Sequence, residues 1–225
     1  MNNNITISPI GSRVSQWGEG PIFWNDHLLY VDIEGHTLIR LNPESGDEEF
    51  WEMGERIGTV VPRVEGGFLC AGDSGIYTFD PITGEKVNVA DPEADKRPDN
   101  RFNDGKCDHL GRFWLSGIRN ESTGINSSIF IFFNNRSCLV KERNNIFLGN
   151  GLGWDKNNKL FYFTDSKKKI IFSYQYSNDP VDIDTRKSVF FELNNCNHEP
   201  DGLCVDKNGY VWSCIWNRHC MVSFS

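Results

Sequence analysis

The chain lacks any apolar run long enough to cross a membrane as a helix, and it lacks a dense cluster of basic residues. Its first residues, Met1-Asn2-Asn3-Asn4, also lack the basic start and apolar stretch of a secretion signal. With 31 acidic against 23 basic residues, the formal net charge is -8. Binding to a phosphate backbone requires a basic face, so neither a membrane nor nucleic acid is expected as a partner.

The seven cysteines include no Cys-x-x-Cys pair, and the five histidines show no metal-ligand spacing. This pattern argues against a disulfide framework or a structural zinc site, and it favours a reducing, cytoplasmic compartment. Cys70 and Cys204 stand within apolar runs and are expected to be buried thiols. A Gly-x-Ser-x-Gly nucleophile elbow is also absent, so covalent acyl transfer has no support.

Helical periodicity is missing too, because no window sustains it over three turns. Instead, short apolar runs alternate with Gly, Asn, Asp and Pro along all 225 residues, which indicates an all-β chain without a linker. Apolar strands recur near residues 28, 67, 111, 159 and 210, a period of about 40 to 50 residues. Four-stranded propeller blades have this period, so residues 1–225 are predicted to form a single β-propeller domain.

The strands of this repeat are separated by recognisable turn sequences. Asn42-Pro43-Glu44-Ser45-Gly46 and Asp80-Pro81-Ile82-Thr83-Gly84 share an (Asn/Asp)-Pro-x-x-Gly pattern. In such a pattern Pro restricts one backbone dihedral and Gly supplies the left-handed one, so both segments are predicted to be tight turns. The most charged segment, residues 91–100, is expected to form a long loop or lid.

One oxygen-bearing side chain recurs at the same point of four repeats. In each, an Asn, Asp or Glu is followed within two residues by Gly, and an apolar strand comes shortly afterwards. If the repeats surround an axis, these side chains converge on it and can bind a hard cation. The four residues are Glu19, Asn103, Asn150 and Asp201. A fifth repeat carries Gly58-Thr59 instead, and is expected to add a blade without a ligand.

A structural explanation competes with this one, since Gly-Asn-Asp clusters before strands are ordinary turn sequences. It suits Asp108, Asp155 and Asp206, which are predicted to form Asx turns. It suits Glu19, Asn150 and Asp201 less well, because they precede strands that start at a narrow central tunnel, where unpaired carboxylates repel each other and need a counter-charge. The residues alone leave both explanations open.

Several longer motifs follow one another along the chain in a fixed order. They are Gly18-Glu19-Gly20-Pro21, Asn100-Arg101-Phe102-Asn103-Asp104-Gly105-Lys106, Asn150-Gly151-Leu152, Tyr162-Phe163-Thr164-Asp165-Ser166 and Pro200-Asp201-Gly202. In these motifs and their order, the sequence resembles the SMP-30/gluconolactonase/regucalcin family over essentially its whole length. The resemblance implies a six-bladed β-propeller with one divalent cation at its centre. Measured against the family pattern, about five blades are recognisable here, the last one partial.

The resemblance also implies roles for individual residues. The metal ligands would be Glu19, Asn150 and Asp201, and Asp201 would also be the general base; the substrate contacts would be Arg101, Asn103 and Glu121. Such oxygen ligands suit Ca²⁺, Mg²⁺ and Mn²⁺, and Zn²⁺ can bind although it prefers His or Cys. The implied activity is hydrolysis of sugar lactones such as gluconolactone, with the cation polarising the lactone carbonyl.

Other assignments remain open at this point. Arg101 could form a loop salt bridge with Asp99 or Asp104, and Glu121 could be simply solvated in its polar loop. The alternative functions are a calcium-binding protein without turnover and an inactive, shortened lactonase. The set of Arg101, Asn103 and Glu121 favours the enzyme, because a pure cation binder needs no groups that face a sugar. The oligomeric state is left undetermined.

Overall fold

The computed structural model describes residues 8–97, 100–119, 124, 126–133, 136–155, 157, 159–176, 183–194 and 196–224. This part of the chain contains nineteen β-strands and one short 3-10 helix, η1 (Ala94–Lys96). Within these ranges, no helix has the length and apolar character needed to cross a membrane.

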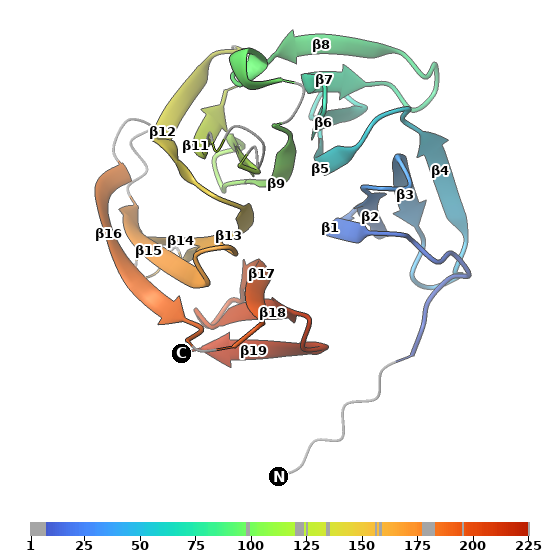
Figure 1. Ribbon diagram of the computed structural model, residues 1–225. Helices are drawn as coiled ribbons and strands as arrows, with labels where there is room; N and C mark the ends of the chain where they lie inside the picture. The colour runs from blue at the N-terminus through green and yellow to red at the C-terminus, as the bar shows by residue number, and fades with distance from the viewer. Residues whose placement is uncertain are drawn as a thin grey trace.

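The strands form five antiparallel sheets around a common axis (Figure 1). The first sheet contains β1 (Gly18–Trp24), β2 (His27–Asp32), β3 (Thr37–Leu41) and β4 (Glu48–Glu52). The second contains β5 (Ile57–Pro62), β6 (Phe68–Gly72), β7 (Gly75–Phe79) and β8 (Lys86–Ala90). The third contains β9 (Phe102–Cys107), β10 (Phe113–Gly117), β11 (Ser127–Phe132) and β12 (Cys138–Ile146). The fourth contains β13 (Gly149–Asp155), β14 (Leu160–Asp165), β15 (Ile170–Tyr176) and β16 (Ile183–Glu192). The fifth has three strands, β17 (Glu199–Val205), β18 (Val211–Trp216) and β19 (Cys220–Phe224).

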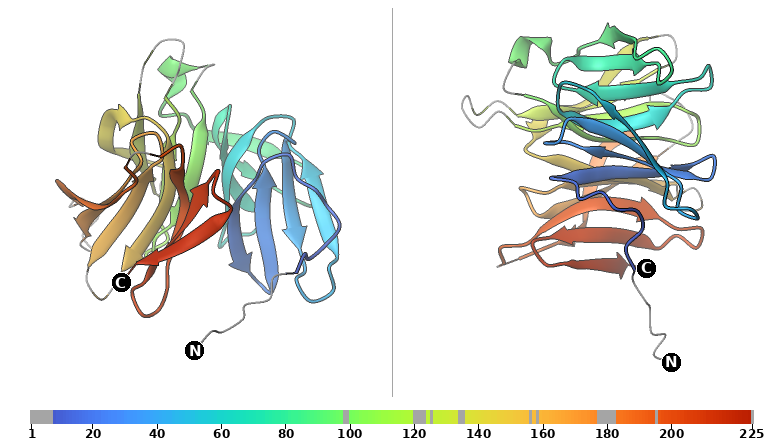
Figure 2. Two further views of the ribbon diagram at one scale, coloured as in Figure 1. Left: turned by 60° about the horizontal axis from the view of Figure 1, so that its bottom comes forward. Right: turned by 90° about the vertical axis from the view of Figure 1, so that its right-hand side faces the viewer.

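Each sheet is a simple meander that starts at the axis and runs outward. Strands β1, β5, β9, β13 and β17 are therefore the innermost strands of their sheets (Figure 1). Figures 1 and 2 show that the first and fifth sheets flank an open side of the ring. The prediction of an all-β propeller with five recognisable blades, the last one partial, is confirmed for the described residues.

Apolar side chains fill the space between neighbouring sheets. Each of the four junctions has its own buried cluster, and burying one large apolar side chain stabilises the fold by about 1.5 to 3 kcal/mol. Representative members are Val31 and Phe68 between the first two sheets, Ile76 and Phe102 at the next junction, Trp114 and Phe161 at the third, and Tyr162 and Leu203 at the fourth.

The fifth sheet is covered on one side only. Along β18, buried Val211, Ser213 and Ile215 alternate with exposed residues. Successive side chains of a strand point to opposite faces, so one face packs on the fourth sheet and the other is open in the described part of the chain. This explains why Cys204 is exposed, contrary to the sequence prediction, whereas Cys70 in β6 is buried as predicted.

The two predicted Pro-containing turns are confirmed. Asn42 and Asp80 each accept backbone N–H bonds through their side chains, and each carbonyl accepts the N–H of the glycine four residues later at 2.8 Å. Gly46 and Gly84 have φ angles of 79° and 76°, in the left-handed region that glycine adopts without a steric penalty. These turns close the first two sheets at their outer strands.

The predicted Asx turns are also present, and one of them is part of the core. Asp108 Oδ1 accepts the N–H groups of Leu110 and Arg112 at 2.9 and 3.0 Å. Its Oδ2 accepts from the Arg112 guanidinium, from Trp114 Nε1 at 2.9 Å and from Tyr176 Oη at 3.2 Å. Because Tyr176 lies on β15, this buried carboxylate joins the third sheet to the fourth.

Asp108→Ala is expected to destabilise the protein by about 3 kcal/mol or more, because it leaves the buried Arg112 guanidinium without its counter-charge. Asp206→Ala is the matched control, since Asp206 makes the same bonds to a turn and to Trp212 but lies on the surface. Urea unfolding followed by tryptophan fluorescence measures both variants. Equal losses of stability in the two variants would contradict the importance of burial.

Candidate active site

The pairing of every innermost strand is interrupted near the same end. In each, the register with the second strand of the sheet shifts, as in a β-bulge. The shifts fall between Glu19 and Ile22, Ile57 and Thr59, Phe102 and Asp104, Gly149 and Leu152, and Pro200 and Leu203. A bulge changes the direction of the side chain it contains. Asn103, Asn150 and Asp201 lie within these irregular segments, and Glu19 lies at the edge of one.

This placement corrects one feature of the sequence interpretation, which put the recurring residues ahead of the first apolar strand of each repeat. They belong instead to the innermost strand itself. The error has a physical cause, since the Gly, Asn and Asp residues typical of turns also occur in bulges, where the chain departs from regular extended geometry.

Glycines beside the bulges allow the innermost strands to approach one another closely. A Cβ on Gly58 would lie 2.3 Å from the carbonyl oxygen of Phe102, and one on Gly151 would lie 2.2 Å from the backbone nitrogen of Leu203. Both distances are too short for any side chain, so a larger residue would push neighbouring sheets apart. Glycine thus keeps the centre of the propeller narrow.

Three carboxylates from three different sheets influence one another at this centre. The pKa of Glu19 is raised to about 8, first by burial and then by the charges of Asp201 and Asp104. Burial and the charge of Asp104 raise the pKa of Asp201 to about 6. Like charges that are close together and poorly solvated disfavour ionisation in this way. The site is therefore one in which negative charge accumulates without an equal number of positive groups.

Asp104 is a member of this group that the sequence interpretation did not select. Its pKa is raised by burial, while Lys106 and the N–H of Gly105 act in the opposite direction. Lys106 itself reaches from β9 to the fifth sheet and donates to the carbonyl of Leu203 at 3.0 Å. The sequence showed a second polar residue next to Asn103, but only the interrupted pairing of β9 shows that both side chains lie near the centre of the propeller.

Asn150 is buried and firmly held. Its Nδ2 donates to Ser166 Oγ at 3.2 Å, and Ser166 in turn donates to the carbonyl of Pro200 at 2.7 Å. The amide of Asn150 also lowers the pKa of the Asp201 carboxyl. With its nitrogen engaged in this way, the amide has its carbonyl oxygen left to offer to a cation.

Asp201 supplies the clearest sign that a cation fits this site. Its Oδ1 is buried and has no hydrogen-bond partner among the described residues. Within the same ranges, His, Cys, Asp and Glu side chains alone form no group of three that could hold a metal ion. A cation would therefore need an amide oxygen as well, and Asn150 beside Glu19 and Asp201 meets that requirement. Their assignment as ligands stays a prediction.

Arg101 is buried, with 8% of its surface exposed, and has no carboxylate within ion-pair distance in the described structure. Its Nη1 donates to the carbonyl of Phe102 at 3.1 Å and to Asn103 Oδ1 at 3.0 Å. Asn103 Nδ2 donates to the carbonyl of Gly149 at 2.9 Å, so Asn103 links Arg101 to the fourth sheet. The alternative of a salt bridge from Arg101 to Asp104 does not occur.

Burial lowers the pKa of Arg101, and the nearby charge of Arg56 lowers it further. Arg56 precedes β5 and is paired with Asp73 through two hydrogen bonds of 3.0 Å, so a second guanidinium stands near the first. Sequence reasoning did not select Arg56. The remaining predicted contact, Glu121, lies outside the described residues, as does Asp99.

Comparison with known proteins assigns the family. The family described as "SMP-30/Gluconolactonase/LRE-like region" matches residues 17–225. The chain belongs to this family. Its suspected resemblance to SMP-30 and gluconolactonase is thereby confirmed, and the match covers every residue of the site described above.

Individual members of the family show how far the likeness extends. Regucalcin from Danio rerio is 27% identical over 220 residues, covering 96% of this chain and 73% of the relative. Pentonolactonase XacC from Haloferax volcanii is 26% identical over 224 residues, covering 98% of this chain and 74% of the relative. The solved structure of a calcium-binding protein, regucalcin, from Agrobacterium tumefaciens superposes with a TM-score of 0.85 at 20% identity, covering 94% of this chain and 71% of that one.

Glu19→Gln is expected to stabilise the cation-free protein by about 1 to 2 kcal/mol at pH 8, since it removes a buried charge that neighbouring carboxylates repel. Because the pKa of Glu19 is raised from 4.5 to about 8, this penalty grows with pH across that interval and vanishes below it. Thermal unfolding in EDTA between pH 4.5 and 8.5 measures the effect, with Glu52→Gln on exposed β4 as control. A gain in stability that did not depend on pH would contradict repulsion between Glu19 and the neighbouring carboxylates.

Proposed function

We propose that the protein is a divalent-cation-dependent lactonase that hydrolyses sugar lactones. One observation carries the proposal: a buried carboxylate oxygen of Asp201, which has no hydrogen-bond partner in the described part of the chain, lies in a cluster of acids, with a buried guanidinium, Arg101, at the same centre. Membership of the family and the lactonase relative support the same reaction class. The substrates we propose are aldonolactones such as gluconolactone.

Glu19, Asn150 and Asp201 would hold the cation, and their oxygens suit Ca²⁺, Mg²⁺ or Mn²⁺, with Zn²⁺ as a further candidate. When bound, such a cation polarises a lactone carbonyl and stabilises negative charge on its oxygen. It would also relieve the repulsion that raises the pKa of Glu19 and Asp201 in the cation-free protein.

Asp201 is proposed as the general base. Its Oδ1 accepts no hydrogen bond from the residues that the structure describes, so it can accept the proton of a water molecule that attacks the lactone. The pKa of about 6 leaves the carboxyl mostly ionised at neutral pH even without a cation. The residue therefore has both the free lone pair and the protonation state that this role requires.

Arg101 is proposed to bind the substrate. Within the described ranges, only its Nη1 is engaged, by Phe102 and Asn103, and its other N–H groups can donate to lactone oxygens. Asn103 was predicted as a second contact, and its two bonds indicate that it mainly orients Arg101. Glu121 remains proposed as a contact to a sugar hydroxyl.

The competing proposal is a calcium-binding protein without turnover, since the Agrobacterium relative is described as calcium-binding. A buried arginine that has no carboxylate partner among the described residues distinguishes the two proposals. A site that only binds a cation gains nothing from a second positive charge beside it, whereas a lactonase uses that charge on the substrate.

Purified protein with added Mn²⁺, Ca²⁺ or Zn²⁺ is expected to acidify an unbuffered gluconolactone solution faster than the same protein in EDTA. The spontaneous reaction with each metal alone is the baseline. Equal rates with and without metal, together with tight Ca²⁺ binding by calorimetry, would favour the non-catalytic protein.

Asp201→Ala is expected to abolish both metal binding and turnover while leaving the circular dichroism spectrum unchanged, because the residue lies beside the axis and outside the buried apolar clusters. Calorimetric titration with Mn²⁺ and the acidification assay provide the two readings. Unchanged Mn²⁺ affinity would remove Asp201 from the ligand set.

A further inference from the structure

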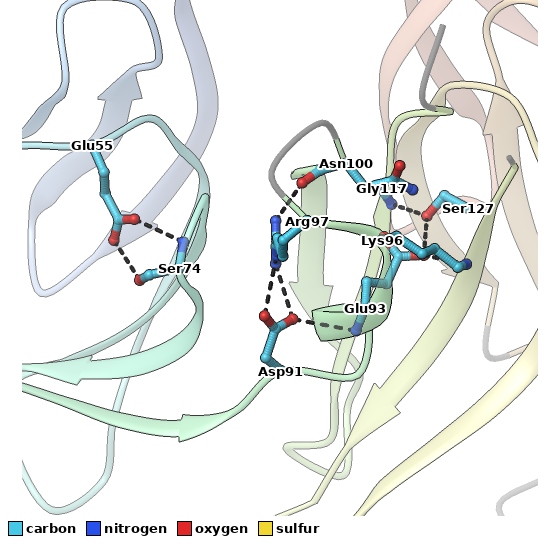
Figure 3. Close-up of polar contacts among 9 residues, drawn as sticks. All are labelled: Glu55, Ser74, Asp91, Glu93, Lys96, Arg97, Asn100, Gly117 and Ser127. Carbon is cyan, nitrogen blue, oxygen red and sulfur yellow. Dashed lines mark hydrogen bonds and ion pairs between the residues drawn. The ribbon is translucent and has the colours of Figure 1, made fainter. Parts of the chain in front are cut away.

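The segment between β8 and β9 is firmly attached to the third sheet. The charged residues 91–100 were expected to form a loop or lid, and the described part contains η1 together with two ion pairs. Asp91 pairs with Arg97 and Glu93 pairs with Lys96, each at 3.0 Å (Figure 3). Arg97 also lies over the ring of Phe102, 5.3 Å from its centroid, which attaches the segment to the start of β9.

Glu93 is completely buried, which is exceptional for a glutamate in a loop. Its Oε1 accepts from Lys96 Nζ at 3.0 Å and from Ser127 Oγ at 2.9 Å. Ser127 Oγ in turn accepts the N–H of Gly117 at 3.1 Å (Figure 3). The carboxylate therefore connects η1 to β10 and β11 through one hydroxyl group.

This connection ends at the backbone that carries Arg101. A Cβ on Gly117 would lie 2.6 Å from the Arg101 carbonyl oxygen and 3.1 Å from Glu93 Oε2, so the three groups meet at one point. The N–H of Ile118 donates to the same Arg101 carbonyl at 3.0 Å. Arg97 Nη1 donates to the carbonyl of Asn100 at 2.5 Å. The carbonyl groups of Asn100 and Arg101, just before β9, thus accept hydrogen bonds from residues that directly follow Lys96 and Gly117 in the sequence.

We infer that Glu93 is a positioning residue for Arg101, acting through Ser127 and Gly117. The inference rests on the proposed function, in which Arg101 binds the lactone. A buried carboxylate with one oxygen lacking a described partner is costly to retain for stability alone. A role in fixing the backbone at residues 100 and 101 accounts for this carboxylate, because a displacement of about 1 Å in a substrate-binding group can lower the catalytic rate by about 100-fold.

The test compares Glu93→Ala, Glu93→Gln and Ser127→Ala with Glu55→Ala. Glu55 is the matched control, because it also accepts from a serine, Ser74, through N–H and Oγ bonds of 2.8 and 2.9 Å, but at the surface (Figure 3). With Mn²⁺ present, Glu93→Ala is expected to raise the KM for gluconolactone about tenfold or more. Mn²⁺ affinity should change less than twofold, and Glu55→Ala should match the wild type.

The milder variants keep the test decisive if Glu93→Ala folds poorly. Glu93→Gln retains an oxygen that accepts from Ser127 and should recover part of the loss. Ser127→Ala keeps the Glu93–Lys96 pair but removes the link to Gly117, so it should raise KM as well. A merely structural role predicts instead a lower melting temperature and a smaller active fraction, with KM unchanged.

A double-mutant comparison assigns the effect to Arg101. In an Arg101→Ala background, Ser127→Ala or Glu93→Gln should cause little further change in kcat/KM, because the group being positioned is already gone. Losses that multiply in full would overturn the inference.

Failure of the proposed function can be told apart from failure of the inference. If the wild type hydrolyses no lactone, amide hydrogen exchange still reports the connection. Gly117 and Ile118 should then exchange at least tenfold faster in Ser127→Ala than in Glu55→Ala or the wild type. Unchanged exchange at both amides would overturn the positioning role whether or not the protein is a lactonase.

Discussion

The displaced pairing near the same end of each innermost strand is the feature on which the candidate site depends. A regular strand would alternate its side chains between the two faces of its own sheet, where they would meet the neighbouring sheets. The bulge interrupts this alternation and makes side chains available to the axis instead. Side chains from the first, third, fourth and fifth sheets thereby meet at one site, and glycines such as Gly58 and Gly151 let the inner strands come close enough together.

This geometry creates a charge problem that defines the chemistry. Glu19, Asp104 and Asp201 lie together in a poorly solvated space. Burial raises the pKa of all three carboxyls, and repulsion from neighbouring carboxylates raises those of Glu19 and Asp201 further. Arg101 shares that space but is not paired with any of them. A divalent cation and a substrate with electron-rich oxygens would together satisfy both signs of charge. The proposed lactonase uses a divalent cation and a lactone substrate, which together meet this requirement.

The polar groups farther out hold this arrangement in place. Asp108 joins the third and fourth sheets, Ser166 holds Asn150, and Glu93 connects η1 to β10 and β11 through Ser127. In these contacts, Asp108, Ser166 and Glu93 bond to residues that lie 16 to 68 positions away in the sequence. They show why single motifs, however specific, describe only part of the site.

The sequence by itself determined the all-β class, the repeat period, and the Pro-containing and Asx turns, because these follow from local residue chemistry and recurrence. Its assignment of Glu19, Asn150 and Asp201 as metal ligands stays a prediction. The sequence interpretation placed those positions ahead of the first strand of each repeat, mistook Cys204 for a buried residue, and passed over Asp104, Arg56 and Glu93. Only the tertiary structure decided these points. Bulge register, the covering of one face of the fifth sheet and the burial of a loop glutamate all depend on contacts between sheets, and no local pattern of residues encodes such contacts.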